Sequence, residues 1–270
     1  MVSSGAYDAV VVVVGGSNND ADSTTEGEGF DRAALSLAGN QLDLIKAVNF
    51  AAGAKKIPIA VVLVDGKPTA EPYLKSDVPA VIAAFQGGQA QGTGVAAVIS
   101  GSANPSGKLP VSFPADAAVL PVYYNHKPSA SRGGWCDFEN GVLWAFGHGL
   151  SFTSFGYTKL AVPATVPADG TLRVTVDVTN TGRVAGTEVA QLYVRDVISS
   201  VTTPVKSLKG FERVTLAPGQ TKTVSFEVDV ADELRILNRA FAWEVEPGAF
   251  KVMVGGSSDD TPATGTFEVV

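Results

Sequence analysis

The pattern of apolar residues changes near residue 155, and this change constrains the fold more than any other feature of the chain. Before it, Ala9–Val14 and Ile59–Val64 are continuous apolar runs, which are typical of parallel strands covered on both faces. A helical spacing of apolar residues over 42–50 lies between them, and a further strand and helix are expected over 78–85 and 94–99. Alternating strands and helices predict an open, mostly parallel α/β/α sandwich.

Beyond residue 171 apolar and polar residues alternate one by one. The alternation is clear in Leu172–Val178, Glu188–Val194 and Thr223–Val228, and Asn-Thr-Gly, Ala-Pro-Gly and Glu-Pro-Gly turns occur in this half. Short strands of this kind are typical of an antiparallel, immunoglobulin-like β-sandwich. The 270 residues suffice for two domains. We therefore expect an α/β domain over 1–115, a connector over 116–160 and an all-β domain over 161–270.

Composition excludes several classes of function. The net charge is −7 and Lys and Arg do not cluster, which argues against nucleic acid or a membrane surface as partner. Cys136 is the only cysteine, beside two histidines, so we expect no intrachain disulfide, no metal site and no cofactor. The chain shows no signal peptide and no apolar stretch of about 20 residues. These features predict a soluble protein and leave its compartment open.

A short acidic segment follows the first apolar run and is the main candidate for chemistry. It reads Glu26-Gly27-Glu28-Gly29-Phe30-Asp31-Arg32. In an open α/β sheet the ligand lies at the carboxyl ends of the strands, and glycines let a loop there turn sharply. A carboxylate in this loop could protonate a leaving group, hold sugar hydroxyls or bind a cation. On the residues alone, a solvated acidic loop is an equal alternative.

Further segments carry a resemblance to a known family. In the first part of the chain they are Gly39–Ile45, Asn104–Pro114 (NPSGKLPVSFP), Leu120–Ala130 and Phe146–Phe152 (FGHGLSF). In the last part they are Val178–Gly182, Leu208–Val214 and Pro247–Val252. Together with the acidic segment, and in this order, they resemble glycoside hydrolase family 3, the β-glucosidases and β-xylosidases. Ala38 stands where the family usually has proline.

The resemblance covers the C-terminal portion of such an enzyme. It implies that 1–115 is the family's C-terminal α/β domain and 161–270 the fibronectin type III-like domain that ends many members. Members normally begin with a (β/α)8 barrel that carries the catalytic aspartate in a Ser-Asp-Trp context, and no Ser-Asp-Trp occurs in this sequence. A barrel is therefore expected as a partner, in the same polypeptide or as a separate one.

The resemblance also implies roles for single residues. The glutamate that acts first as general acid and then as general base corresponds to Glu28, with Glu26 as the runner-up because several members read Glu-x-Glu-Gly. Partial burial would bring the pKa of such a carboxyl toward the range of an acid catalyst. Asp31, Arg32 and Gln41 are weaker candidates for binding substrate, and for Asp31 and Arg32 an ion pair that orders the loop is favoured.

The implied activity of the complete enzyme is hydrolysis of terminal β-linked glucose or xylose with retention. This chain would supply the acid/base glutamate and lack the nucleophile, so the isolated chain is predicted to be inactive. Two alternatives remain: a non-catalytic carbohydrate-binding or interaction module, and a split-enzyme subunit that needs a barrel partner. The resemblance does not choose the sugar or the linkage. Members are often secreted or periplasmic.

The β-sandwich offers no acid/base pair, and its expected role is structural. We expect it to fold alone from about Thr171 and to bind no soluble sugar. Trp243 is the only tryptophan in it. The sequence places Trp243 in a strand before the Glu-Pro-Gly turn, and we expect it to pack inward near Phe250. Trp135, Trp144, His126 and His148 are interpreted as packing or interface residues rather than catalytic ones.

Overall fold

The structure is a computed structural model that describes residues 7–17, 25–27, 32–128 and 141–270. The chain divides into two units that do not follow the sequence in simple order. The first comprises residues up to 103 together with 113–122 and the residues preceding Trp144. The second comprises 104–112, the segment that begins at Tyr123, and Trp144–Val270.

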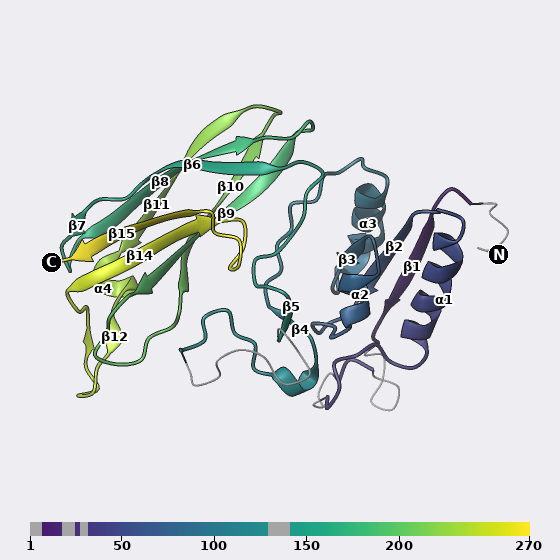
Figure 1. The fold of residues 1–270 in the computed structure, drawn as a ribbon, viewed down its shortest axis with the longest axis horizontal. Helices are drawn as coiled ribbons and strands as arrows, with labels where there is room; N and C mark the ends of the chain where they lie inside the picture. Colours follow the sequence, from purple (N-terminus) through teal and green to yellow (C-terminus); the bar gives the residue numbers. More distant parts are fainter. Residues whose placement is uncertain (1–6, 18–24, 28–31, 129–140) are drawn as a thin grey trace. The chain divides into compact units, whose positions relative to one another are not determined.

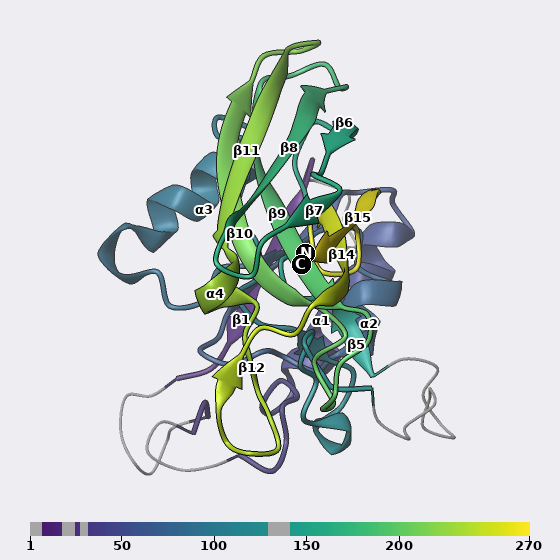
Figure 2. The same cartoon turned by 90° about the vertical axis from the view of Figure 1, so that its left-hand side faces the viewer.

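Three parallel strands form the centre of the first unit. They are β1 (Val10–Gly15), β2 (Ile59–Val64) and β3 (Val81–Ala83), in the order β1-β2-β3. Helix α1 (Gln41–Gly53) lies on one side of this sheet and α3 (Gln91–Ile99) on the other (Figures 1 and 2). This arrangement confirms the predicted α/β/α sandwich. The shorter elements of the unit are α2 (Pro72–Ser76), η2 (Gly88–Ala90), β4 (Phe113–Pro114), η3 (Ala117–Val119) and the start of β5 (Val142–Trp144).

Burial differs between the central and the edge strand. Val61, Val62 and Leu63 of β2 are all buried, as expected of a strand covered on both faces. Strand β1 was expected to be covered in the same way, but it is not: Val12 and Val14 are buried, whereas Val13 is 62% exposed. Val12 and Val14 share one face of the sheet and Val11 and Val13 the other, so only one face of β1 is covered in the described residues.

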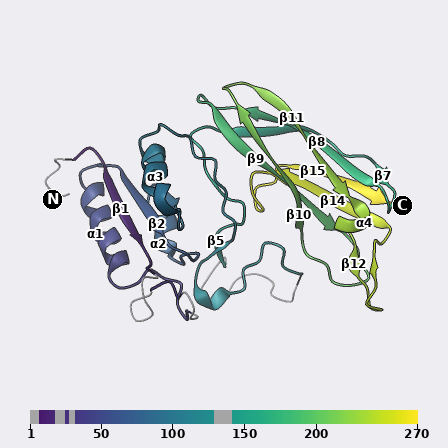
Figure 3. The ribbon, with the colours of Figure 1, turned by 180° about the vertical axis from the view of Figure 1, so that it is seen from behind.

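Two packed sheets form the second unit, as the alternating pattern predicts (Figures 1 and 3). The larger sheet has the order β10-β9-β14-β15-β7 and the smaller one the order β11-β8-β6. All described pairs are antiparallel except β15 with β7. The strands are β6 (Phe155–Ala161), β7 (Thr165–Val166), β8 (Thr171–Asn180), β9 (Gly186–Asp196), β10 (Ser207–Leu216), β11 (Thr221–Asp229), β14 (Gly248–Gly255) and β15 (Ala263–Val269), with a short helix α4 (Val230–Glu233).

The core of the sandwich follows from the period of two. Leu172, Val174, Val176 and Val178 of β8 are fully buried, at alternate positions along the strand. They face a cluster that the other sheet supplies, which includes Leu192, Val252 and Phe267. Successive side chains of a strand point to opposite faces, so a strand with one buried face alternates in this way.

Asn180 ends β8 and is completely buried, with all of its side-chain hydrogen-bonding groups in use. Its Nδ2 donates to the carbonyls of Val184 (2.8 Å) and Leu216 (3.0 Å). Its Oδ1 accepts from the Gly182 amide (3.0 Å) and the Thr153 hydroxyl (2.7 Å). One side chain therefore ties the Asn-Thr-Gly turn to two other segments of the sandwich.

We expect Asn180→Ala to lower the free energy of unfolding of the sandwich by about 2–3 kcal/mol, because buried partners lose their hydrogen bonds. The measurement is the urea midpoint of the second unit's transition. Thr179→Ala is the matched control, since the Thr179 hydroxyl shares an exposed hydrogen bond with Thr221 (2.8 Å) and its loss should change stability by less than about 0.5 kcal/mol. Equal effects of the two substitutions would contradict this role.

The two glycine-rich motifs of the resemblance pack against each other in the second unit. The Leu109 amide donates to the His148 carbonyl and the Gly147 amide to the Leu109 carbonyl, both at 2.8 Å. Gly147 has a φ of +80°, and a Cβ at Gly149 would lie 2.1 Å from the Gly107 carbonyl oxygen. Only glycine allows this approach. These hydrogen bonds and this close approach form a joint between the two motifs, and half-buried His148 contributes its backbone carbonyl to it.

Trp243 does not pack inward, and that expectation is wrong. Its strand, β13 (Trp243–Glu244), pairs with β12 (Ile236–Leu237) in a separate hairpin, which projects from the two sheets of the sandwich (Figures 1 and 2). Trp243 is 62% exposed and Phe241, in the turn, is 85% exposed. Phe250, by contrast, is buried and stacks on Phe267. The emission of Trp243 is therefore expected at the long-wavelength position of a solvated indole.

Candidate functional site

The acidic segment begins where β1 ends, at the carboxyl edge of the parallel sheet. After β1, the Gly16 amide donates to the Val64 carbonyl of β2 (3.0 Å). Two hydrogen bonds then join Ser17 and Thr25. The Thr25 amide donates to the Ser17 carbonyl (2.7 Å), and the Ser17 amide donates to the Thr25 hydroxyl (2.9 Å). This pair brings the chain back to the strand ends and positions the next residue, Glu26.

Glu26 is buried at this edge, with 9% of its surface exposed. Its Oε2 accepts a hydrogen bond from Nε2 of Gln86, which follows β3. Two glycines leave the space that the side chain occupies: a Cβ at Gly16 would lie 2.1 Å from Cγ of Glu26, and a Cβ at Gly66 would lie 2.4 Å from its Oε2. Gly16 follows β1 and Gly66 follows β2, so residues after all three parallel strands surround the carboxylate.

The other predicted residues of the segment lie around Glu26 in the sequence. Gly27 has a φ of +85°, in the left-handed region that favours glycine. Glu28 and Asp31 lie outside the described residues, so their predicted roles stay predictions. Arg32 is described and exposed.

The side-chain amide of Gln41 hydrogen-bonds to the backbone at the end of β1 and just before α1. Its Oε1 accepts from the Gly15 amide (2.7 Å) and its Nε2 donates to the carbonyls of Gly15 (2.9 Å) and Ala38 (3.1 Å). The first residue of α1 is thereby tied to the last residue of β1. These bonds use both polar atoms of the amide, and binding of substrate by Gln41 stays a prediction.

A second polar cluster follows β2 and is not among the residues that the sequence predicts for the site. Asp65 is 3% exposed and pairs with Nζ of Lys67 (2.7 Å), and its Oδ2 also accepts from the Thr69 hydroxyl (2.8 Å). Buried Glu71 accepts from the Leu37 amide (3.1 Å) and so holds the segment that follows Arg32. The sequence does contain one signal for this cluster: Asp65 comes directly after a buried parallel strand.

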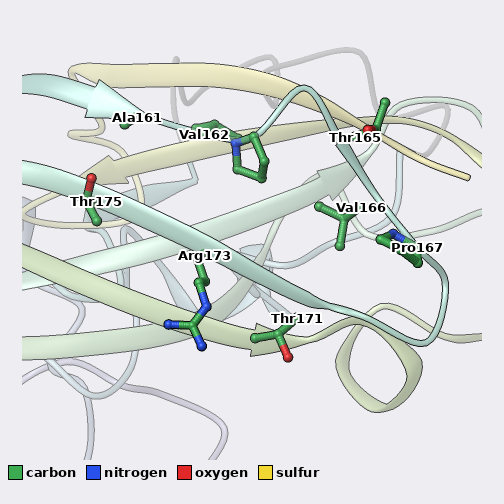
Figure 4. A pocket seen from close by; sticks show the side chains of 9 residues that line it. Ala161, Val162, Thr165, Val166, Pro167, Thr171, Arg173 and Thr175 are labelled. Carbon is green, nitrogen blue, oxygen red and sulfur yellow. The ribbon is translucent and has the colours of Figure 1, made fainter.

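The described residues of the second unit include an ion pair between two nearly buried side chains, Lys108 and Glu188, neither of which lines the pocket in Figure 4. Figure 4 shows a shallow pocket beside Val166 and Pro167, where β8 contributes Thr171, Arg173 and Thr175. Arg173, the only charged residue of this lining, is paired with Glu227. His126 is exposed, and its Nδ1 lies 3.1 Å from the carbonyl oxygen of Lys127. Trp144 is half-buried. Trp135 lies outside the described residues.

Two features are absent from the part of the chain that the structure describes. It contains no group of three or more His, Cys, Asp or Glu side chains that could hold a metal ion. None of its helices is long and apolar enough to cross a membrane.

Comparisons with known proteins agree with this architecture. The family model described as the glycosyl hydrolase family 3 C-terminal domain matches residues 2–152, and a fibronectin type III-like domain model matches 188–258. A β-xylosidase of Formosa agariphila is 44% identical over 93% of this chain, and a periplasmic β-glucosidase of Salmonella typhimurium is 38% identical over 97%. This chain covers 34% of either relative.

Solved structures show the same fold. The β-glucosidase from Listeria innocua in complex with glucose is 31% identical and superimposes with a TM-score of 0.88 over 98% of this chain and 37% of its own. The β-glucosidase from Kluyveromyces marxianus is also 31% identical, with a TM-score of 0.83 over 100% of this chain and 32% of its own. The chain thus spans about a third of the length of these relatives. With a parallel α/β unit and a fibronectin type III-like sandwich that both match, this chain belongs to glycoside hydrolase family 3, in its C-terminal portion.

Proposed function

We propose that this chain supplies the acid/base half of a retaining β-glycosidase active site, with Glu28 as the acid/base residue. The observation that carries the proposal is the origin of the acidic segment at the carboxyl edge of the parallel sheet, in a chain of this family. A (β/α)8 barrel, in the same or a separate polypeptide, supplies the nucleophile. The substrate is a glycoside with a terminal β-linked glucose or xylose, since relatives of both names match.

The chemistry divides between the two parts. In the first step, the barrel's carboxylate attacks the anomeric carbon while Glu28 protonates the departing glycosidic oxygen, so a glycosyl-enzyme forms and the aglycone leaves. In the second step, Glu28 removes a proton from water as the water attacks the same carbon. Two displacements at one carbon retain its configuration. A chain with only one of the two carboxylates completes neither step at a useful rate.

The isolated chain is therefore expected to fold and to show almost no turnover of aryl β-glucosides or β-xylosides. Turnover should appear when a family 3 barrel is supplied, fused upstream or as a separate polypeptide. The measurement compares the chain, the barrel and their combination at equal concentrations. The barrel alone is the matched control, because it retains the nucleophile without the acid/base. Retaining turnover by the chain alone, abolished when one of its own aspartates is replaced, would overturn the proposal.

A second candidate function, a carbohydrate-binding module, is favoured by the β12–β13 hairpin. Trp243 borders a shallow groove of about 440 Å³ together with Asp169, Arg235 and Glu244. An exposed indole beside polar groups can stack on a sugar ring. A saturable change of tryptophan emission on adding xylo- or cello-oligosaccharides, absent in Trp243→Phe, would support this function; no change up to millimolar oligosaccharide would reject it.

A further inference from the structure

We propose that Glu26 is a positioning residue: its buried carboxylate anchors the acidic segment to the ends of the three parallel strands, while the neighbouring Glu28 acts on substrate. The part of this inference that concerns catalysis rests on the proposed function. The part that concerns the anchor rests on the described residues alone.

The geometry of the anchor comes from three strands. Gly16 and Gly66 stand at the ends of β1 and β2, and the side chain of Glu26 fills the space where each would carry a Cβ. Gln86, after β3, donates to Oε2 of Glu26. Burial of a carboxylate is costly without hydrogen bonds, and the bond from Gln86 to Oε2 offsets part of this cost.

This burial separates the tasks of the two glutamates. An acid/base residue must come within hydrogen-bond reach of the glycosidic oxygen. Glu26 is 9% exposed and enclosed by the strand ends, so it would have to leave its site to reach a sugar. The backbone on both sides holds Glu26 in this place: Ser17 and Thr25 hydrogen-bond to each other directly before it, and Gly27, with a φ of +85°, turns the chain directly after it.

The anchor is tested on the full chain by a double-mutant cycle between Gly16→Ala and Glu26→Ala. Gly16→Ala places a methyl group where Cγ of Glu26 lies, so we expect it to lower the melting temperature of the first unit by roughly 4–10 °C. In the Glu26→Ala background the space is vacant, and Gly16→Ala should cost less than about 2 °C. Gly66→Ala should show the same dependence on Glu26.

The matched control for this cycle is Gly94→Ala in α3. No heavy atom outside its own helix lies within 4 Å of a Cβ at Gly94. This substitution should therefore change the melting temperature equally, and by little, whether or not Glu26 is present. An equal cost of Gly16→Ala in the wild-type and Glu26→Ala backgrounds would show that the side chain does not occupy this space, and would overturn the anchor.

The positioning role is tested in the enzyme assembled with a barrel, by comparing Glu26→Gln, Glu26→Ala and Glu28→Gln. Glutamine retains an oxygen that accepts from Gln86 but does not transfer a proton as a carboxyl does. We expect Glu26→Gln to keep kcat within about threefold of the wild type, and Glu26→Ala to lower kcat by about 10–100-fold for good and poor leaving groups alike. Azide should restore neither variant of Glu26.

The outcomes separate the two proposals. If Glu26→Gln loses as much turnover as Glu26→Ala and azide restores it, Glu26 is the acid/base residue and the positioning role is wrong. If Glu26→Ala leaves kcat unchanged in an active assembly, the anchor has no catalytic consequence and the positioning role is again wrong. If the wild-type assembly itself is inactive, the proposed function fails, while the melting-temperature cycle still decides the anchor.

Discussion

Glu28→Ala in the assembled enzyme is expected to lower turnover by about 10²–10⁴-fold on glycosides with poor leaving groups, the usual contribution of a general acid or base. The loss in the first step should shrink as the leaving group becomes more acidic, because a good leaving group needs little protonation. A series of aryl β-glucosides or β-xylosides with graded phenol pKa values measures this dependence. A steep dependence on leaving group in the variant, and a shallow one in the wild type, identifies the residue that donates the proton.

Azide distinguishes the acid/base residue from its neighbours. Without Glu28 the glycosyl-enzyme lacks a base to activate water, and a small anionic nucleophile needs none, so azide should speed breakdown of the intermediate and give a glycosyl azide of retained configuration. Glu26→Ala should be milder and should not respond to azide. The reverse ranking of the two alanine variants, with azide acting on Glu26→Ala, would transfer the assignment to Glu26.

The parallel sheet could be predicted because its strands depend on local composition. Val61 and Leu63 lie in a run with no polar residue, and such a run suits only a covered strand or helix. The rule that ligand loops follow the carboxyl ends of strands then drew attention to residues 26–32. Coverage of β1 was predicted less well, since a valine at an edge and a valine in the centre of a sheet are the same in the sequence.

The partners of Glu26 could not be predicted in the same way. Gln86 is 60 residues away from it in the sequence, and neither Gly16 nor Gly66 carries a side chain that would suggest a role. Their common property is position, because each of the three follows a strand of the same sheet. Applying the strand-end rule to β2 and β3, as well as to β1, would have found Gly66, Asp65 and Gln86.

Trp243 shows where period-two reasoning fails. Trp243 and Val245 are two residues apart and would share a face of one continuous strand. Val245 does pack against the sandwich core, but Trp243 belongs to the two-residue strand of another hairpin. The Arg235 guanidinium lies over the indole ring of Trp243, 5.2 Å from the ring centroid. Alternation predicts a face only as long as the strand continues, and the sequence does not mark where a strand this short ends.

Lys108, in the NPSGKLP motif, forms a nearly buried ion pair that we expect to contribute strongly to the stability of the second unit. Its Nζ lies 3.0 Å from Oε1 of Glu188 on β9, and both side chains are nearly buried, at 15% and 7% exposed. Nζ also donates to the Gly149 carbonyl (3.2 Å). The Tyr157 hydroxyl donates to the same Glu188 oxygen (3.3 Å), and burial followed by the Glu188 charge raises the pKa of Tyr157 well above its ordinary value. The hydroxyl therefore remains a donor when Lys108 is removed.

Lys108→Met is expected to lower the free energy of unfolding of the second unit by about 3–5 kcal/mol, because it leaves the Glu188 carboxylate buried with only a neutral donor. The melting temperature should fall by roughly 6–20 °C. Lys159→Met is the matched control: Lys159 also pairs with a carboxylate, Asp177, at 3.0 Å, but its side chain is 81% exposed. Its loss should cost at most about 1 kcal/mol.

The double variant Lys108→Met/Glu188→Gln separates charge from packing. Glutamine can still accept from Tyr157, and no charge remains to be buried, so the double variant should recover most of the stability that Lys108→Met loses. If the double variant is as unstable as Lys108→Met, the lysine acts through its hydrogen bond to Gly149 and the packing of its stem, and the ion pair contributes little. If it recovers, the pair explains why a lysine lies inside the joint between the two glycine-rich motifs: Glu188 of β9 requires a cation there, and that cation fastens the joint to the sandwich.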